Sequence, residues 1–335
     1  MTRWYLGLAM ALGACGNSSA TTDARPIDAV PDAAGPPYFH PRPGAYRNWD
    51  IQLHPPFDLS GIRSMYMLSL WDLVPSTMTM DYGDGDPVTV PAGQLAGMLA
   101  ALHARTPIAP IVICVVDTGA WEAARPDARK FPGFMADATM IPDSPTPPAA
   151  GSVIGWSVNG DKTERFLDIL PAHVLLWEPL IQKRLDLAKA IGCDGVMGDR
   201  NDSVTSQPGP GFTYDESMEA MFQFNWYKEV ADQTHMRVMS AGMKDSDEIP
   251  SATDFLAPSF DWMLMERCAE FTSCDPARPF INLIEAVFGL EYDPDSQGNP
   301  TNAMVSCQIE AMGNIQDGLI KDDLLSDVER IQCVP

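Results

Sequence analysis

Acidic side chains directly follow short apolar runs at several points of this chain. Gly195–Asp199 is such a run, and its closing aspartate is followed by Arg200 and Asp202. Phe260–Met265 is another, and it ends at Glu266. A carboxylate that emerges from a buried strand can serve as an acid, a base or a nucleophile. On this feature alone, an aspartate that caps the following helix is an equal alternative.

Two such carboxyl groups in one site can divide acid/base and nucleophilic roles between them. We assign Asp199 as nucleophile or charge stabiliser and Glu266 as acid/base, and the two roles could be exchanged. Arg200 or Lys244 would favour the ionised form of Asp199, and Met265 and Trp262 would favour the protonated form of Glu266. The alternative for Glu266 is a solvated or ion-paired structural carboxylate.

The elements that must position these side chains alternate between strand and helix. Strands are predicted at Trp49–Leu53, Met65–Leu70, Ile108–Val116, Phe166–Ile169, Gly195–Asp199, Met236–Met243, Phe260–Met265 and Ala286–Leu290. Helices are predicted at Gln94–Arg105, at Leu180–Ile191 with Gly192 as its stop, and at Met218–Gln233. Eight alternating units predict an α/β fold, a (β/α)8 TIM barrel, whose strand ends meet at one rim. A doubly wound open sheet is the alternative, weakened because no Gly-x-Gly-x-x-Gly follows the first strand.

The N-terminal residues have the pattern of a secretion signal and a tether. Residues 1–14 combine Arg3 with the apolar run Leu6–Leu12, which predicts a signal peptide. The sequence Leu-Gly-Ala-Cys that ends at Cys15 resembles the lipobox of bacterial lipoproteins, which implies lipidation of Cys15 and, with Gly16 next, the outer membrane. A plain signal peptide with an incidental cysteine is the alternative. Residues 15–45 contain almost no large aliphatic side chains and predict a disordered tether, which leaves residues 46–335 as the domain.

The acidic composition limits the classes of partner. The 335 residues carry a formal net charge of −23. We expect no nucleic-acid partner, because phosphate binding needs clustered Lys and Arg. An acidic surface suits a cationic substrate such as an amino-sugar polymer, although simple solubility is the alternative. We expect a monomer that meets the membrane only through its N-terminal lipid.

The remaining cysteines predict disulfides in an exported protein. Cys268 and Cys274 lie close together in a loop-like stretch, and Cys307 and Cys333 are the next pair. Cys114 and Cys193 lie in or beside apolar strand runs, so we expect buried thiols there. No Cys-x-x-Cys occurs and the five histidines are scattered, so no metal site or cofactor is predicted.

Several stretches of the chain resemble glycoside hydrolase family 114. They are Asn48–Leu53, Thr118–Glu122, Arg125–Asp127, Phe166–Ile169, Arg184–Ala188, Met265–Cys268 and Ala286–Tyr292. The resemblance runs from about residue 46 to about residue 325. It implies a TIM barrel with endo-α-1,4-polygalactosaminidase activity on a partly deacetylated galactosamine polymer.

The resemblance also implies which residues are catalytic. The family's fifth strand typically ends Glu-Pro-Asp-Asn, and this chain keeps Asp199 but has Met197 and Arg200 at the first and last of these positions. The seventh-strand glutamate is kept as Glu266. Other family positions are kept in part, as Asp168 and as Lys244 followed by Asp245. Because Met197 replaces a family glutamate, a catalytically impaired glycan-binding lipoprotein on the same barrel is the alternative function.

Polar and aromatic residues near the predicted strand ends are the candidates for substrate binding. They are Trp49, Gln52, Asp117, Trp121, Asp168, Lys244, Asp245, Glu291 and Tyr292. The two tryptophans could stack on sugar rings, although a tryptophan taken alone is more often a core residue. The aspartates would suit a sugar that carries an ammonium group, with helix capping or a structural ion pair as their alternative. Lys244 could bind a sugar hydroxyl or neutralise Asp199.

Overall fold

The structure is a computed structural model that describes residues 37–46, 48–214, 218–244, 252–315, 317–328 and 330–333. The chain divides into Met1–Gly35 and a compact unit, Pro36–Pro335. The predicted signal peptide, Cys15, most of the tether and Asp245 lie outside the described residues. Within those ranges, every helix is too short or too polar to cross a lipid bilayer.

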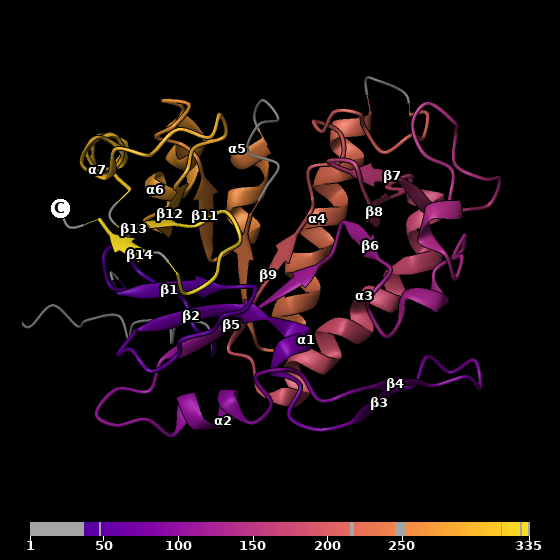
Figure 1. The fold of residues 1–335 in the computed structure, drawn as a ribbon, viewed down its shortest axis with the longest axis horizontal. Coiled ribbons are helices and arrows are strands. Elements are labelled where there is room, and N and C mark those ends of the chain that lie inside the picture. The colour runs from indigo at the N-terminus through magenta and orange to yellow at the C-terminus, as the bar shows by residue number, and fades with distance from the viewer. Residues whose placement is uncertain are drawn as a thin grey trace, which may run out of the picture. The chain divides into compact units, whose positions relative to one another are not determined.

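A nine-stranded sheet forms the centre of the compact unit (Figure 1). In spatial order its strands are β1 (Trp49–Gln52), β2 (Met65–Ser69), β5 (Ile111–Asp117), β9 (Gly195–Asp199), β10 (Ser240–Met243), β11 (Trp262–Glu266), β12 (Ala286–Tyr292), β13 (Asp317–Lys321) and β14 (Arg330–Gln332). Neighbours are parallel from β1 through β13, and β14 is antiparallel to β13. Eight parallel strands therefore bring their carboxyl ends to one edge.

The first and eighth of these parallel strands contact each other through side chains. The indole Nε1 of Trp49 donates to the Asp317 carbonyl at 2.7 Å. The buried Lys321 ammonium lies 3.2 Å from the carboxylate of Asp50. Arg330 donates to the Trp49 carbonyl at 2.7 Å. The sheet is therefore curled, with its two ends held together.

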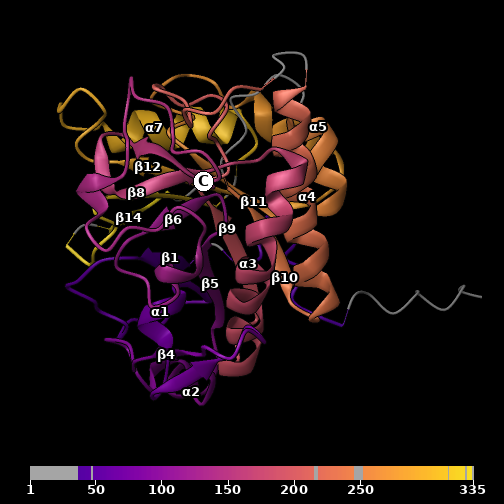
Figure 2. The same cartoon turned by 90° about the vertical axis from the view of Figure 1, so that its right-hand side faces the viewer.

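Helices cover the outside of the curled sheet. They are α1 (Leu70–Leu73), α2 (Met98–His103), α3 (Pro171–Ile191), α4 (Glu219–Met236), α5 (Ala252–Leu256), α6 (Arg278–Asn282) and α7 (Ala303–Met312), with 3-10 turns at Ala128–Lys130, Ala138–Met140, Ala257–Ser259 and Asp275–Ala277. Figure 2 shows α3 and α4 side by side, in front of β9 and β10. Helix α3 begins earlier than predicted, at Pro171, which needs no N–H partner in the first turn. It ends where predicted, because Gly192 takes a left-handed φ of 101°.

Two strands differ from the sequence prediction. The apolar run at Phe166 belongs to β8 (Asp161–Leu167), which pairs antiparallel with β6 (Ala120–Glu122) and β7 (Ile154–Val158) in a separate sheet. The eighth parallel strand is instead β13. A short apolar run does not reveal whether its strand is parallel or antiparallel. The predicted strand at Met236–Met243 also begins later, because Met236 ends α4. A small hairpin, β3 (Met78–Met80) with β4 (Val88–Val90), completes the strands.

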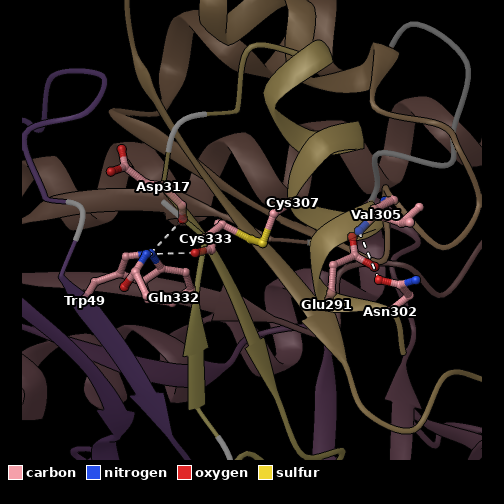
Figure 3. Close-up of a disulfide and its surroundings, with 10 residues drawn as sticks. Trp49, Glu291, Asn302, Val305, Cys307, Asp317, Gln332 and Cys333 are labelled. Atoms are coloured by element: carbon pink, nitrogen blue, oxygen red, sulfur yellow. Dashed lines mark hydrogen bonds between the residues drawn. A yellow bond between two sulfur atoms is a disulfide. The ribbon is translucent and has the colours of Figure 1, made fainter. Parts of the chain in front are cut away.

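Three disulfides link the described residues. The pairs Cys268–Cys274 and Cys307–Cys333 are formed as predicted, and Figure 3 shows the second one joining α7 to the segment after β14. The prediction of free thiols at Cys114 and Cys193 is wrong, because these two residues form the third disulfide. Cys114 lies opposite Val196 in the β5–β9 ladder, which brings Cys193 within reach.

Candidate active site

A cleft of about 800 Å³ lies at the carboxyl ends of β9 to β12. The end of each strand, or the residue that follows it, contributes one polar side chain to the wall: Asp199, Lys244, Glu266 and Tyr292. Consecutive parallel strands deliver these groups to the same edge, as expected for the end of such a sheet where active sites lie. The sequence prediction that Asp199 and Glu266 meet in one cleft agrees with this placement.

Lys244 contacts both carboxylates. Its Nζ lies 2.8 Å from Asp199 Oδ1 and 2.9 Å from Glu266 Oε2. Because both oxygens contact one nitrogen, they lie no more than about 6 Å apart. The exposed fraction of the Glu266 side chain is 25%, against 11% for Asp199. Glu266 is therefore the more accessible acid.

Two tyrosines orient this group of charges. The Tyr292 hydroxyl donates to Glu266 Oε1. The Tyr227 hydroxyl donates to the Gly198 carbonyl at 2.9 Å and accepts the Lys244 N–H at 2.6 Å. Tyr227 thus joins the backbone before Asp199 to the backbone of Lys244. The apolar surroundings predicted for Glu266 are not found, since an ammonium and a phenol contact it.

Arg200 turns away from the carboxylate that precedes it. Its backbone has a left-handed φ of 64°, and its N–H donates to Asp199 Oδ1 at 2.8 Å. Its guanidinium forms a bidentate pair with Glu164 of β8, at 2.6 and 3.2 Å. Burial raises the pKa of Glu164, and Arg200 opposes that rise. The arginine therefore ties the β8 hairpin to the end of β9.

Asp202 is a further acid of the cleft wall. Its Oδ2 accepts a hydrogen bond from the Ser206 hydroxyl at 3.2 Å. Its Oδ1 is buried without a hydrogen-bond partner among the residues that the structure describes. Burial raises the pKa of Asp202, while the ammonium of Lys244 opposes that rise. The carboxylate adds negative charge next to the Asp199–Lys244 pair.

Asp117 lies opposite Asp199 in the β5–β9 ladder but does not line the cleft. Its carboxylate lies 3.4 Å from the guanidinium of Arg125, which also binds Glu122. Burial, with the charge of Asp117 second, raises the pKa of Glu122 well above its ordinary value. The acid predicted to bind substrate at this strand end is part of a neighbouring ion-pair cluster.

Both predicted stacking tryptophans are core residues. Trp49 and Trp121 have no exposed surface. Trp49 donates to the Asp317 carbonyl, and Trp121 donates to the Ala128 carbonyl at 3.0 Å. Neither ring presents a face to the cleft, so the stacking prediction for both residues is wrong.

Three other predicted polar residues are buried anchors for loops. The side-chain amide of Gln52 donates to the Asp58 carbonyl and accepts the Asp58 N–H, each at 2.8 Å. Asp168 accepts the Leu170 N–H at the start of α3 at 2.9 Å and contacts the His173 imidazole. These side chains shape the loops at the strand ends and do not line the cleft.

Glu291 is the third of these anchors. Its carboxylate accepts the N–H groups of Ala269 and Glu270, at 2.7 and 3.2 Å. Burial raises the pKa of Glu291 to about 6. It holds the loop that the Cys268–Cys274 disulfide closes, and this loop borders the cleft.

Several cleft residues were not predicted from the sequence. They are His54, Asn159, Arg267, Phe271, Ser273, Asp323 and Leu324. A signal was present for Arg267, which directly follows Glu266, and for Phe271 and Ser273, which lie between the next two cysteines. Asn159 lies at the tip of the β7–β8 hairpin and does not follow a parallel strand in the sequence. No group of three or more His, Cys, Asp or Glu within the described ranges is arranged to hold a metal ion.

Comparisons with known proteins agree with this fold. The sequence model of glycoside-hydrolase family GH114 matches residues 32–331. The crystal structure of Aspergillus fumigatus Ega3 in complex with galactosamine is similar with a TM-score of 0.64 and 22% sequence identity, over 88% of this chain and 97% of that one. At this identity the likeness shows the fold alone.

A second solved structure is the 3-dehydroquinate dehydratase of Aquifex aeolicus VF5, whose match covers 42% of this chain and 61% of that chain with 11% sequence identity. Its TM-score of 0.29 is too low to bear on the fold. No curated protein matches the sequence. The family match extends over nearly the whole compact unit and includes every strand of the nine-stranded sheet except the last residue of β14. The chain therefore belongs to glycoside-hydrolase family GH114 and is a glycosidase.

Proposed function

We propose that this glycosidase cleaves an amino-sugar polysaccharide, an α-1,4-linked galactosamine polymer, with Asp199 and Glu266 on a closed (β/α)8 barrel. The observation that carries the proposal is the contact of both carboxylates with Lys244 in one cleft. Asp199 acts as the nucleophile and Glu266 as the acid/base. Ega3, which shares this fold, was solved with galactosamine.

The mechanism follows from the positions of the two acids. Glu266, the more exposed one, protonates the leaving glycosidic oxygen while Asp199 attacks the anomeric carbon and forms a glycosyl ester. Glu266 then takes a proton from water, and that water cleaves the ester and frees Asp199. The ammonium of Lys244 stabilises the ionised form of Asp199 between turnovers.

The charge of the cleft supports a cationic sugar. Arg200 is paired with Glu164, and Arg267 is paired with Glu270 at 2.6 Å. Among the Lys and Arg side chains of the wall that leaves Lys244, which lies with His54 against four acids: Asp199, Asp202, Glu266 and Asp323. A cleft with an excess of negative charge concentrates polymers that carry free ammonium groups.

Release of reducing ends from a deacetylated galactosamine polymer tests the proposal. We expect the wild type to release them and Asp199→Asn and Glu266→Gln to be slower by about 10²–10⁴-fold. Asp186→Asn, which removes a half-exposed acid of α3 that does not line the cleft, is the matched control. Equal release by all four proteins would remove the proposed chemistry. No release by any of them, with the polymer still bound, would favour the glycan-binding alternative that Met197 suggests.

We further propose that the protein is exported and anchored by a lipid on Cys15, with residues 15–45 as the tether. The lipobox-like sequence before Cys15 supports this proposal. Metabolic labelling with a fatty acid should label the wild type but not Cys15→Ser. Equal labelling of both would contradict it.

A further inference from the structure

We propose that a second groove binds residues of the same polymer beyond the catalytic cleft. The groove encloses about 400 Å³ and is lined by Trp156, Phe212 and Tyr214, all partly exposed, with Pro145 and Pro147. This inference rests on the proposed function, because it takes its occupant to be the amino-sugar chain on which the cleft acts. The groove would bind sugar rings of the polymer that lie beyond the bond being cleaved.

The ring of Trp156 is held in one orientation. Its indole N–H donates to the Thr146 carbonyl at 2.7 Å, and its backbone N–H donates to the Pro210 carbonyl at 3.0 Å. Gly211, with a φ of 81°, packs directly against the indole ring. A Cβ atom added to this residue would lie only 2.6 Å from the ring carbon Cδ2. Glycine is therefore needed there both for its left-handed backbone and for this close contact. A ring fixed in this way loses little entropy when a ligand stacks on it.

The neighbouring aromatic rings are also held. Phe212 lies against the backbone of Gly155, where an added Cβ would come within 2.8 Å of the phenyl ring. The Tyr214 hydroxyl donates to Asp168 Oδ1 at 3.1 Å, and the ring centroids of Phe212 and Tyr214 are 6.5 Å apart. Asp168, predicted as a substrate residue, thus orients an aromatic side chain of this groove.

Two segments of the chain connect the wall of the catalytic cleft to the wall of the groove. After β9, Asp202 lines the cleft and Ser206 lines the groove, and their side chains are hydrogen-bonded. In the β7–β8 hairpin, Asn159 lines the cleft and Trp156 lines the groove. These two residues are three positions apart, about 10 Å of extended chain. A polymer that leaves the cleft next to either segment reaches the groove within a few sugar rings.

The chemistry of the lining fits a sugar chain that carries ammonium groups. Aromatic rings stack on the C–H faces of sugars, and Ser206, Gln207 and Thr213 can bond hydroxyl groups. Glu219 adds a carboxylate, and neither Lys nor Arg is among the described residues of the lining. A phosphate-bearing or anionic chain would find no countercharge there.

Kinetics on substrates of two lengths test the inference. We expect Trp156→Ala and Phe212→Ala to raise KM for the long polymer roughly threefold to tenfold, the range expected for the loss of one aromatic contact. The kcat on the polymer and both constants on a galactosamine tetramer should stay at wild-type values, and Trp156→Tyr should restore KM. Phe255→Ala on α5, an exposed aromatic residue outside both cavities, is the control. An unchanged polymer KM, or an equal change on the tetramer, would overturn the inference.

Binding to the polymer separates this inference from the proposed function. Retention of Asp199→Asn on immobilised deacetylated polymer should fall when Trp156→Ala is added to it. If the wild type releases no reducing ends but retention still depends on Trp156, the hydrolase proposal fails and the groove stands. If reducing ends are released and retention does not depend on Trp156, the groove is overturned and the hydrolase proposal stands.

Discussion

Asp199 and Glu266 reach the same ammonium group from two strands that are not neighbours. Asp199 ends β9 and Glu266 ends β11, and β10, which lies between them, is followed by Lys244. Three consecutive parallel strands thus deliver an anion, a cation and an anion. The ammonium between the two carboxylates offsets their mutual repulsion, so both can be ionised close together.

Lys244→Met should remove this balance. Without the ammonium the two carboxylates repel each other, so each binds its proton more tightly and the acidic limb of the pH–rate profile moves to higher pH. We expect kcat on the polymer to fall about 10²-fold, within the range for the loss of one electrostatic contact in an active site. Lys228→Met on the exposed face of α4, which also removes an ion-paired lysine, is the control. An unchanged pH profile would show that Lys244 does not act on the two acids.

The separation of the two carboxylates predicts the stereochemistry of cleavage. The two oxygens bonded to Lys244 are at most about 6 Å apart. This is below the spacing of about 6.5–9.5 Å between the carboxyl groups of inverting enzymes, which makes room for a water molecule between the base and the sugar. We expect net retention, so the first product of an α-linked polymer is the α anomer. Proton NMR during the first minutes of the reaction distinguishes the anomers. A β anomer that appears first would assign Asp199 as a base instead.

The strand ends could be predicted from the sequence because parallel strands share one direction. Apolar runs that end in Asp199 and Glu266 must present those residues at the same edge once the strands are parallel. The strand β13 could not be recognised in this way. Its first and last residues, Asp317 and Lys321, are polar, and Lys321 is buried only because Asp50 pairs with it from the far end of the chain. Such a partner cannot be seen in a local pattern.

The direction in which a side chain points was the main obstacle to predicting the site. Trp49 and Glu291 lie at or near strand ends, but alternate residues of a strand point to opposite faces. A shift of one residue in the assumed register sends a predicted cleft residue into the core. The groove residue Trp156 lies in an antiparallel hairpin, where the rule about parallel strand ends does not apply.

Loss of the Cys114–Cys193 disulfide should cost more stability than loss of Cys268–Cys274. The first closes a loop of 79 residues and the second a loop of 6. In the chain-entropy model the stabilisation grows with loop length, and a typical disulfide contributes about 2–4 kcal/mol. The double variants to alanine, compared by urea unfolding, provide the measurement. A larger loss for the Cys268–Cys274 pair would mean that folded-state contacts dominate.

Arg184 should be among the residues whose removal is most destabilising. Its guanidinium binds both Asp127 oxygens, at 2.8 and 2.9 Å, and donates to the Asp117 carbonyl at 2.8 Å. Both side chains of the pair are fully buried. Arg184→Met leaves the Asp127 charge unpaired, which should lower the free energy of unfolding by about 3–5 kcal/mol. Adding Asp127→Asn should recover part of the loss, and a purely additive double variant would contradict a direct coupling of the two.

Glu310 is a buried acid that takes no part in the proposed chemistry. It lies on α7 with 1% of its surface exposed, and its carboxyl group faces the strand glycines Gly289 and Gly318. Neither carboxyl oxygen has a hydrogen-bond partner among the residues that the structure describes. Burial, with the charge of Glu291 second, raises the pKa of Glu310 to about 8. At neutral pH this carboxyl group is therefore protonated in the folded chain.

Glu310 should make the protein less stable as the pH rises. Below the ordinary pKa of 4.5 both folded and unfolded chains carry the proton, so the residue adds no pH dependence to the stability. Between pH 4.5 and about 8 only the unfolded chain releases it, so the contribution of this group to the free energy of unfolding falls by up to about 1.4 kcal/mol per pH unit. We expect Glu310→Gln to lose this slope when urea unfolding is measured from pH 5 to 8, while Glu229→Gln on the surface of α4 keeps it. Parallel stability curves for Glu310→Gln and the wild type would show that Glu310 is ionised in the folded chain.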